Sequence, residues 1–237
     1  MSRPAPGPGS VESLYPFLYA GQTDVSVVLE QVRASTVAKA QEIIELRRAV
    51  CESHGSALAA CGAEMARRFA AGGRLLAFGN GGSATDAQQL VTVFANPGGT
   101  ARPLPALGLA SDPSVLTALA NDVGTEVVFA RQIGALGRPA DIAVGLSTSG
   151  NSANLLRAFD EARARGMLTV GIAGYHGGRM AELDSIDYLF VAPSASVHRI
   201  QEAQTTMYHA LWELCQAAIG AGDTAVAAGD VPRAGAS

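Results

Sequence analysis

The amino-acid sequence predicts an α/β protein, a three-layer α/β/α sandwich with a five-stranded parallel sheet, N-terminal helices and a long C-terminal helix. Five short apolar runs alternate with helix-like stretches from residue 74 onward. Continuous apolar runs between helices are typical of strands that are buried on both faces of a parallel sheet. Hydrophobic residues make up 48% and charged residues 16% of the 237-residue chain, which is typical of a globular protein with one domain and a helical addition.

The residues before the first strand are predicted to form a flexible extension followed by helices. Residues 1–23 begin with a stretch that is rich in Gly and Pro and poor in bulky apolar side chains, which favours disorder. The aromatic segment Ser13–Thr23 is a candidate docking element or a local hydrophobic clasp. In residues 24–73 apolar side chains recur at three- and four-residue steps, and this spacing predicts one helix over 24–52 and a second over 56–71.

The segment 74–220 is predicted to be the domain that contains the sheet. Helix-like stretches follow the first and third strands, at 84–95 and 151–166. Apolar side chains at helical intervals predict a long closing helix over 198–220, and the small residues of 221–237 predict a disordered tail. The five predicted strands are Arg74–Gly79, Leu104–Ala110, Asp141–Ser147, Met167–Ala173 and Ile186–Ala192.

Charge and composition exclude several classes of function. The formal net charge of −4 leaves no basic surface of the kind that binds nucleic acid directly. No stretch of about 18 apolar residues is present and no apolar leader follows the N-terminus, so we expect a cytoplasmic protein without membrane attachment. The three cysteines lack CxxC spacing and are interpreted as reduced structural thiols. The GxGxxG pattern of dinucleotide sites is absent, and we expect no cofactor.

Two loops that follow predicted strands carry residues suited to a phosphate group. In a parallel sheet, ligands collect at the carboxyl ends of the strands, where helix N-termini point free amides outward. The first loop, Gly79–Ser83, contains three glycines that allow close backbone approach to an anion. Ser83 is predicted both to cap the following helix and to donate a hydroxyl. The alternative interpretation is an ordinary strand-to-helix turn.

The second loop, Ser147–Ser152, places four hydroxyl groups and a helix N-terminus within six residues. This loop contains neither a lysine nor an acidic metal ligand. It therefore suits a phosphate monoester better than a nucleoside triphosphate with its magnesium. The alternative interpretation is a serine-rich cap that serves only the helix.

Four segments of the sequence, LLAFGNGGSATDAQQ, ALAND, GLSTSGNSANLLRAF and RIQEAQTTMYH, together resemble the sugar-isomerase (SIS) domain, and within it the phosphoheptose isomerase group. The resemblance covers roughly residues 42–219 and implies the SIS fold. It also implies a heptulose phosphate as ligand and a homotetramer with sites between subunits. The phosphosugar contacts that it implies come from Asn80, Gly81, Gly82, Ser83, Asn121, Asp122, Ser147, Thr148, Ser149, Ser152 and Gln201.

The sequence departs from the group at the helix after GNGGS. In phosphoheptose isomerases this helix usually carries His and, four residues later, Glu, a metal-binding pair whose Glu is also catalytic. Helical i,i+4 spacing places such a pair on one face. The corresponding residues here are Gln89 and Val93. Valine neither ligates zinc nor moves a proton, and glutamine is a poor zinc ligand, so we expect no bound metal.

The loss of this pair bears directly on catalysis. Isomerisation of a ketose phosphate to an aldose phosphate needs a base that moves a proton between C1 and C2 and a donor for the oxygens. His209, which the last predicted helix keeps, is the candidate for one role, with a plain core or interface histidine as the alternative. The second role falls to Glu202, Asp86, another subunit or no group at all.

Two functions stay open from the sequence. One is a phosphosugar-binding protein with residual or altered ketose–aldose isomerase activity. The other is a non-catalytic oligomeric adaptor that binds a protein partner, because LTALAND and RQIGALG are similar to a branch of the family that associates with the bacterial replication initiator. A sugar-responsive transcription regulator needs a basic helix-turn-helix before the sugar domain, and residues 1–73 show none.

The spacing of two candidate residues bears on assembly. Gln201 and His209 are eight residues apart, which places them about 12 Å apart along one helix axis. If both residues serve one small ligand, a neighbouring subunit must supply one of them. This expectation agrees with the oligomer that the resemblance implies.

Overall fold

The computed structural model describes residues 25–229, and a five-stranded parallel sheet organises them. The strand order is β2-β1-β3-β4-β5, and every neighbouring pair is parallel. The chain leaves β1 for β2 on one side and then returns to β3 on the other, so the point where the order reverses lies between β1 and β3. The strands are β1 (Leu75–Gly79), β2 (Ala106–Gly108), β3 (Ile142–Ser147), β4 (Leu168–Gly174) and β5 (Tyr188–Ala192). The predicted sheet is confirmed.

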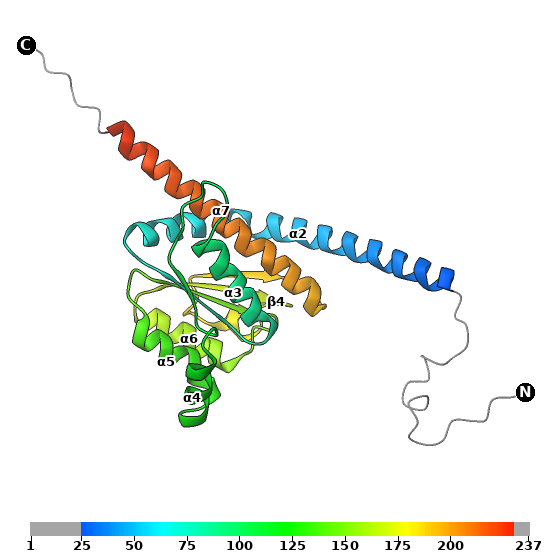
Figure 1. Cartoon of the computed structure of the whole chain (residues 1–237), viewed down its shortest axis with the longest axis horizontal. Coiled ribbons are helices and arrows are strands. Elements are labelled where there is room, and N and C mark those ends of the chain that lie inside the picture. Colours follow the sequence, from blue (N-terminus) through cyan, green and yellow to red (C-terminus); the bar gives the residue numbers. More distant parts are fainter. Residues whose placement is uncertain (1–24, 230–237) are drawn as a thin grey trace, which may run out of the picture. The chain divides into compact units, whose positions relative to one another are not determined.

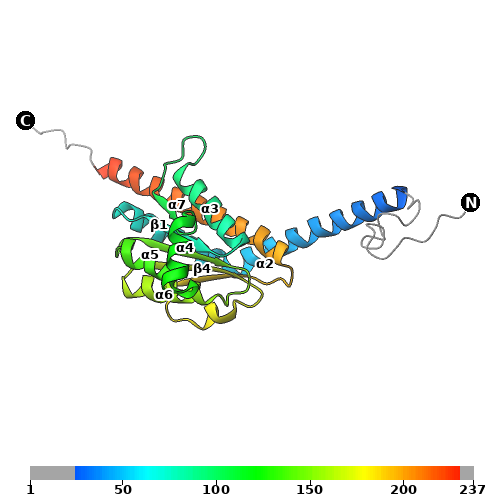
Figure 2. The same ribbon diagram turned by 60° about the horizontal axis from the view of Figure 1, so that its bottom comes forward.

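Helices cover both faces of this sheet. Figures 1 and 2 show α3 and α7 on one side and α5 and α6 on the other, which confirms the three predicted layers. The helices are α2 (Val25–Ala70), α3 (Gly82–Ala95), α4 (Pro113–Asp122), α5 (Val128–Leu136), α6 (Ala153–Ala164) and α7 (Val197–Gly229), with short 3₁₀ helices η2 (Thr125–Val127) and η3 (Gly178–Glu182). Among residues 25–229, no helix combines the length and the hydropathy that a membrane span requires.

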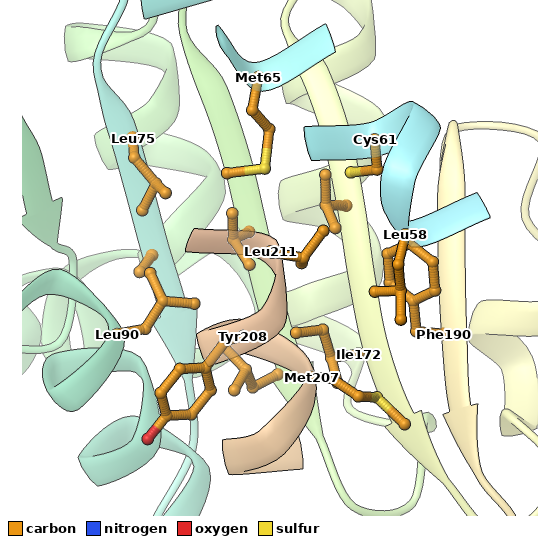
Figure 3. Packing of buried hydrophobic residues seen from close by; sticks show 14 of the residues in the cluster. Leu58, Cys61, Met65, Leu75, Leu90, Ile172, Phe190, Met207, Tyr208 and Leu211 are labelled. Atoms are coloured by element: carbon orange, nitrogen blue, oxygen red, sulfur yellow. The ribbon is translucent and has the colours of Figure 1, made fainter. Parts of the chain in front are cut away.

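The apolar strand sequences are explained by burial on both faces. Leu75 and Ala77 of β1 belong to the core cluster under α3, α7 and the end of α2, whereas Leu76 and Phe78 belong to the cluster under α5 and α6. Successive side chains of a strand point to opposite faces, so a strand with helices on both sides must be apolar throughout. Figure 3 shows the first cluster, in which Met65 of α2 and Leu211 of α7 lie over the sheet.

The prediction of two N-terminal helices is wrong, because α2 is continuous from Val25 to Ala70. The Ser53 hydroxyl donates to the Ala49 carbonyl at 2.7 Å, inside the helix, instead of ending it. Gly55 costs about 1 kcal/mol relative to alanine in a helix. Burial of Val50 and Leu58 on either side, at 5% and 6% exposure, offsets that cost.

Two compact units divide the described residues, with the boundary between Glu42 and Ile43 inside α2. The unit that contains the sheet therefore includes the last part of α2, which the sequence analysis grouped with the N-terminal helices. At the other end, α7 extends beyond residue 220, where a disordered tail was predicted to begin, to Gly229. The predicted extension 1–23, with its aromatic segment, and residues 230–237 lie outside the described residues.

The burial of the cysteines predicts which thiol reacts in the folded protein. Cys51 is exposed, whereas Cys61 and Cys215 are fully buried. Burial raises the pKa of Cys215 to about 12 and raises that of Cys61 well above its usual range. We expect a disulfide reagent at pH 8 to modify Cys51 alone, and the other two thiols only after unfolding. Mass spectrometry of the labelled chain, with Cys51→Ser as control, checks this, and fast labelling of all three would contradict it.

Candidate functional site

Both predicted phosphate loops lie at the reversal point of the sheet. The first connects β1 to α3 and the second connects β3 to α6. β1 and β3 are neighbours in parallel register, with Gly79 opposite Leu146, so both loops leave the same edge of the sheet. This is the crevice in which ligands of open α/β sheets bind.

The first loop offers backbone amides instead of a serine cap. Gly81, with φ of +54°, is the N-cap of α3, and no side chain caps the helix. The prediction that Ser83 caps it is therefore wrong, because Ser83 lies inside the first turn, is 5% exposed and donates its amide to the Asn80 carbonyl at 3.0 Å. Among the described residues, the amides of Gly81 and Gly82 have no hydrogen-bond acceptor. An anion at this helix N-terminus would meet both.

The second loop is held in shape by its own hydroxyls. Ser147 Oγ accepts the Gly150 amide at 2.9 Å, and Ser149 Oγ accepts the Asn151 amide at 3.3 Å. Ser152 is the N-cap of α6, but its side chain makes no cap hydrogen bond. A cap that serves only the helix therefore does not describe this loop. The hydroxyl hydrogens of Ser147 and Ser149 stay available as donors, because each oxygen acts as an acceptor within the loop.

A pair of amide side chains joins the two loops. Asn80 Nδ2 donates to Asn154 Oδ1, and Asn154 Nδ2 donates to Asn80 Oδ1, both at 2.9 Å. Asn154 lies in the first turn of α6, so the pair bridges the reversal point between β1 and β3. The resemblance implies Asn80 as a contact but not Asn154, whose only signal in the sequence is its place at the start of a helix after a serine-rich loop.

The turn after β4, which leads into η3, forms hydrogen bonds with the second loop. The Met180 amide donates to the Gly150 carbonyl at 3.0 Å, and the Arg179 amide donates to Asn151 Oδ1 at 2.9 Å. Tyr175, at the start of this turn, has φ of +51°, a conformation in which a residue other than glycine is strained. The sequence analysis did not identify this turn, because nothing in its residues indicates that it packs on Ser147–Ser152.

Two glutamines of α7 reach the loops. Gln204 is fully buried, and its Nε2 donates at 3.2 Å to the carbonyls of both Ser147, at the end of β3, and Ile172, near the end of β4. Its Oε1 has no hydrogen-bond partner within the described residues. Gln201, a contact that the resemblance implies, lies against the first loop, because a Cβ on Gly82 would collide with the Gln201 amide. Gln201 Nε2 donates to Asp86 Oδ2 at 3.2 Å.

Three other candidate residues, Asn121, Asp122 and His209, form no hydrogen bond with either loop within the described residues. Asn121 and Asp122 are exposed at the end of α4, where Asn121 Nδ2 donates to Asp122 Oδ1 at 2.8 Å. His209 is half-buried, its ring centroid lies 5.1 Å from that of Tyr208, and it lines a pocket of about 370 Å³ with Arg47 and Glu213. No hydrogen bond joins these three predicted residues to either loop within the part of the chain that the structure describes.

The residues at the family's metal positions do not fit a metal ion. Gln89 is exposed on α3, and Val93 is half-buried against the core cluster. Neither side chain is a strong metal donor. Across residues 25–229, no group of three or more His, Cys, Asp or Glu side chains is placed to hold a metal.

Comparison with known proteins agrees with this architecture. The SIS domain model matches residues 40–174. The phosphoheptose isomerase of Roseiflexus sp. (strain RS-1) is 40% identical over 190 residues, which cover 80% of this chain and 91% of that protein. The phosphoheptose isomerase of Desulfovibrio desulfuricans is 46% identical over 178 residues, 75% of this chain and 84% of that protein. The structure of a phosphoheptose isomerase from Neisseria gonorrhoeae superposes with a TM-score of 0.71 at 33% identity, covering 78% of this chain and 99% of that one.

Proposed function

Because the chain belongs to the SIS-domain family and to its phosphoheptose isomerase group, we propose that it binds a heptulose phosphate such as sedoheptulose 7-phosphate and isomerises it to the aldose phosphate. The relatives named above are phosphoheptose isomerases, which supports a phosphosugar as ligand. The proposal places the protein in the cytoplasm, which stays a prediction from its sequence.

The observation that carries the proposal is the pair of loops joined by Asn80 and Asn154. Two amides of the first loop without an acceptor among the described residues and the hydroxyls of the second loop lie at the same edge of the sheet, and neither loop contains a lysine. The hydroxyls of the second loop are neutral donors, and such donors suit a dianionic phosphate monoester, which brings its own charge. We assign the phosphate to Ser147–Ser152 and the sugar hydroxyls to the first loop, Asn121 and Asp122.

The proposed reaction is tested by incubating the purified protein with sedoheptulose 7-phosphate, with and without added zinc, and following aldose phosphate by NMR. We expect conversion that zinc does not accelerate, because Gln89 and Val93 supply no metal donors. Binding without any conversion would contradict the isomerase activity. It would favour the second candidate, a non-catalytic oligomeric adaptor for a protein partner, which the missing donors at these two positions also support.

We also propose that the protein is a homotetramer with sites shared between subunits. The first unit supports this, because Val27, Leu29, Val32 and Val37 of α2 are apolar and between 50% and 63% exposed. Within one chain, Gln201 and His209 lie about 12 Å apart along α7, so a site that uses both needs a second copy.

The assembly is checked by light scattering after size exclusion. We expect the mass of four chains for the wild type and a smaller mass for Leu29→Glu with Val32→Glu, because the charges would face an apolar interface. Ser35→Glu, at an exposed polar position of the same helix, is the matched control and should leave the mass unchanged. A monomeric wild type would contradict the proposal.

A further inference from the structure

Asp86 is a carboxylate held beside the first loop by a side chain from another helix. It lies on α3, one turn after the Gly81 cap, and is half-buried. Gln201 Nε2 donates to its Oδ2 at 3.2 Å, and the same amide packs on Gly82. Among the described residues, Asp86 Oδ1 has no hydrogen-bond partner. The hydrogen bond to Oδ2 thus fixes the orientation of the carboxylate, and Oδ1 can accept a proton.

Glu202, the other acidic candidate from the sequence, is placed differently. Its side chain is 41% exposed, and its carboxylate forms an ion pair with Arg199 on the preceding turn of α7. It directly follows Gln201, and adjacent residues of a helix point about 100° apart. Glu202 therefore faces away from the direction in which Gln201 meets Asp86 and Gly82.

The surroundings of Asp86 suit a proton acceptor. Burial between α3 and α7 raises the pKa of its carboxyl, and the hydrogen bond from Gln201 opposes that rise only in part. A carboxylate with a raised pKa is a stronger base than an exposed one.

We infer that Asp86 is the catalytic base of this chain, which moves the proton between C1 and C2 of the ketose phosphate in place of the glutamate missing at position 93. The inference rests on the proposed isomerisation. With the phosphate assigned to Ser147–Ser152, a sugar that reaches Asp86 would have to extend past the Asn80–Asn154 pair toward α3, where Gln201 of α7 contacts Asp86.

The step balances without a redox partner. The Asp86 carboxylate takes the C1 proton, the C1–H electron pair becomes the C1–C2 double bond, and the carbonyl oxygen on C2 takes a proton from water to give an enediol. Asp86 then returns its proton to C2, while the hydroxyl on C1 loses its proton to water and becomes the aldehyde. The composition of the sugar phosphate is unchanged.

The test measures proton exchange at C1 of sedoheptulose 7-phosphate in D₂O by NMR, with ligand binding measured separately by calorimetry. We expect Asp86→Asn to slow exchange about 10²–10⁴-fold, the usual contribution of a proton-transfer group, with the Kd within about threefold of wild type. Asp160→Asn, an exposed carboxylate on α6, is the matched control and should exchange at the wild-type rate. Formate added to Asp86→Ala should restore part of the rate, which a merely structural role of Asp86 does not predict.

The other possible results of this experiment would overturn the role of Asp86, the isomerase activity or phosphosugar binding. The assignment of Asp86 is overturned if Asp86→Asn exchanges the C1 proton at the wild-type rate. It is also overturned if Glu202→Gln, instead of Asp86→Asn, loses proton exchange. A wild type that binds the sugar phosphate but exchanges no proton overturns this inference and the isomerase activity while leaving phosphosugar binding intact. Absence of binding by the folded wild type overturns the proposed function itself. If Asp86→Asn melts far below the wild type, the Asp86→Ala variant with and without formate decides alone, and absence of rescue overturns the inference.

Discussion

Gly150→Ala is expected to abolish measurable binding of sedoheptulose 7-phosphate and to lower the free energy of unfolding by more than any other single methyl addition in the second loop. Gly150 has φ of +68°, where a side chain costs about 1–2 kcal/mol. An added Cβ would also collide with the Gly177 carbonyl of the turn after β4. The loop must then move off that turn, and the Ser147 hydroxyl loses the Gly150 amide that it accepts.

A matched control variant separates the backbone strain of a side chain at positive φ from the collision of the added Cβ. Gly72 has φ of +81°, but an added Cβ there meets nothing within 4 Å. Gly72→Ala should therefore show the strain alone, about 1–2 kcal/mol by urea unfolding, with unchanged ligand affinity. Calorimetric affinity and unfolding curves of both variants decide the matter. Equal destabilisation by the two substitutions, or wild-type affinity in Gly150→Ala, would show that the second loop does not depend on the turn.

Gln89→His with Val93→Glu is expected to create zinc binding and to raise the isomerisation rate, by about 10²–10⁴-fold if the new glutamate transfers a proton better than the wild-type groups do. Gln89 is exposed, so histidine fits without repacking. Val93 packs against the core cluster, and a carboxylate there loses apolar contacts and is partly desolvated, so we expect a lower melting temperature.

Elemental analysis, the NMR assay and thermal melting check this double variant. Val93→Gln, with nearly the shape of glutamate and no charge, is the control for the packing change, and Gln89→His alone is the control for a single donor. A folded double variant that binds zinc and stays as slow as the wild type would mean that the crevice differs from that of the relatives in more than these two residues. That result would favour the adaptor.

The sheet was predictable from the sequence because burial on both faces leaves a strong local signal. The runs around Leu76, Val144 and Val170 are apolar at almost every position, and the structure places each in an interior strand. The second strand is shorter than predicted, Ala106–Gly108 instead of 104–110, because it is an edge strand with one neighbour and only partial burial. The continuity of α2 was missed because packing, not propensity, carries the helix through Gly55.

The site was predictable only in its local parts. The two loops could be predicted because their glycines and hydroxyl side chains lie between a predicted strand and a predicted helix, which is a local feature of the sequence. Asn154, Gln204 and the turn at Tyr175 act through strand order and helix packing, which bring them to the loops from distant parts of the chain. The burial of Ser83 was missed for the same reason, because the first turn of α3 is covered only once the sheet and α7 have assembled.

The proposed function requires that the crevice between β1 and β3 recognise a phosphate monoester on a sugar. Isothermal titration calorimetry of the wild-type protein with sedoheptulose 7-phosphate and with unphosphorylated sedoheptulose, under the same conditions, measures this recognition. We expect saturable binding of sedoheptulose 7-phosphate and no detectable binding of unphosphorylated sedoheptulose, because each hydrogen bond to the charged group contributes about 1.5–3 kcal/mol. Equal affinity for the two sugars, or no binding of either, would contradict it.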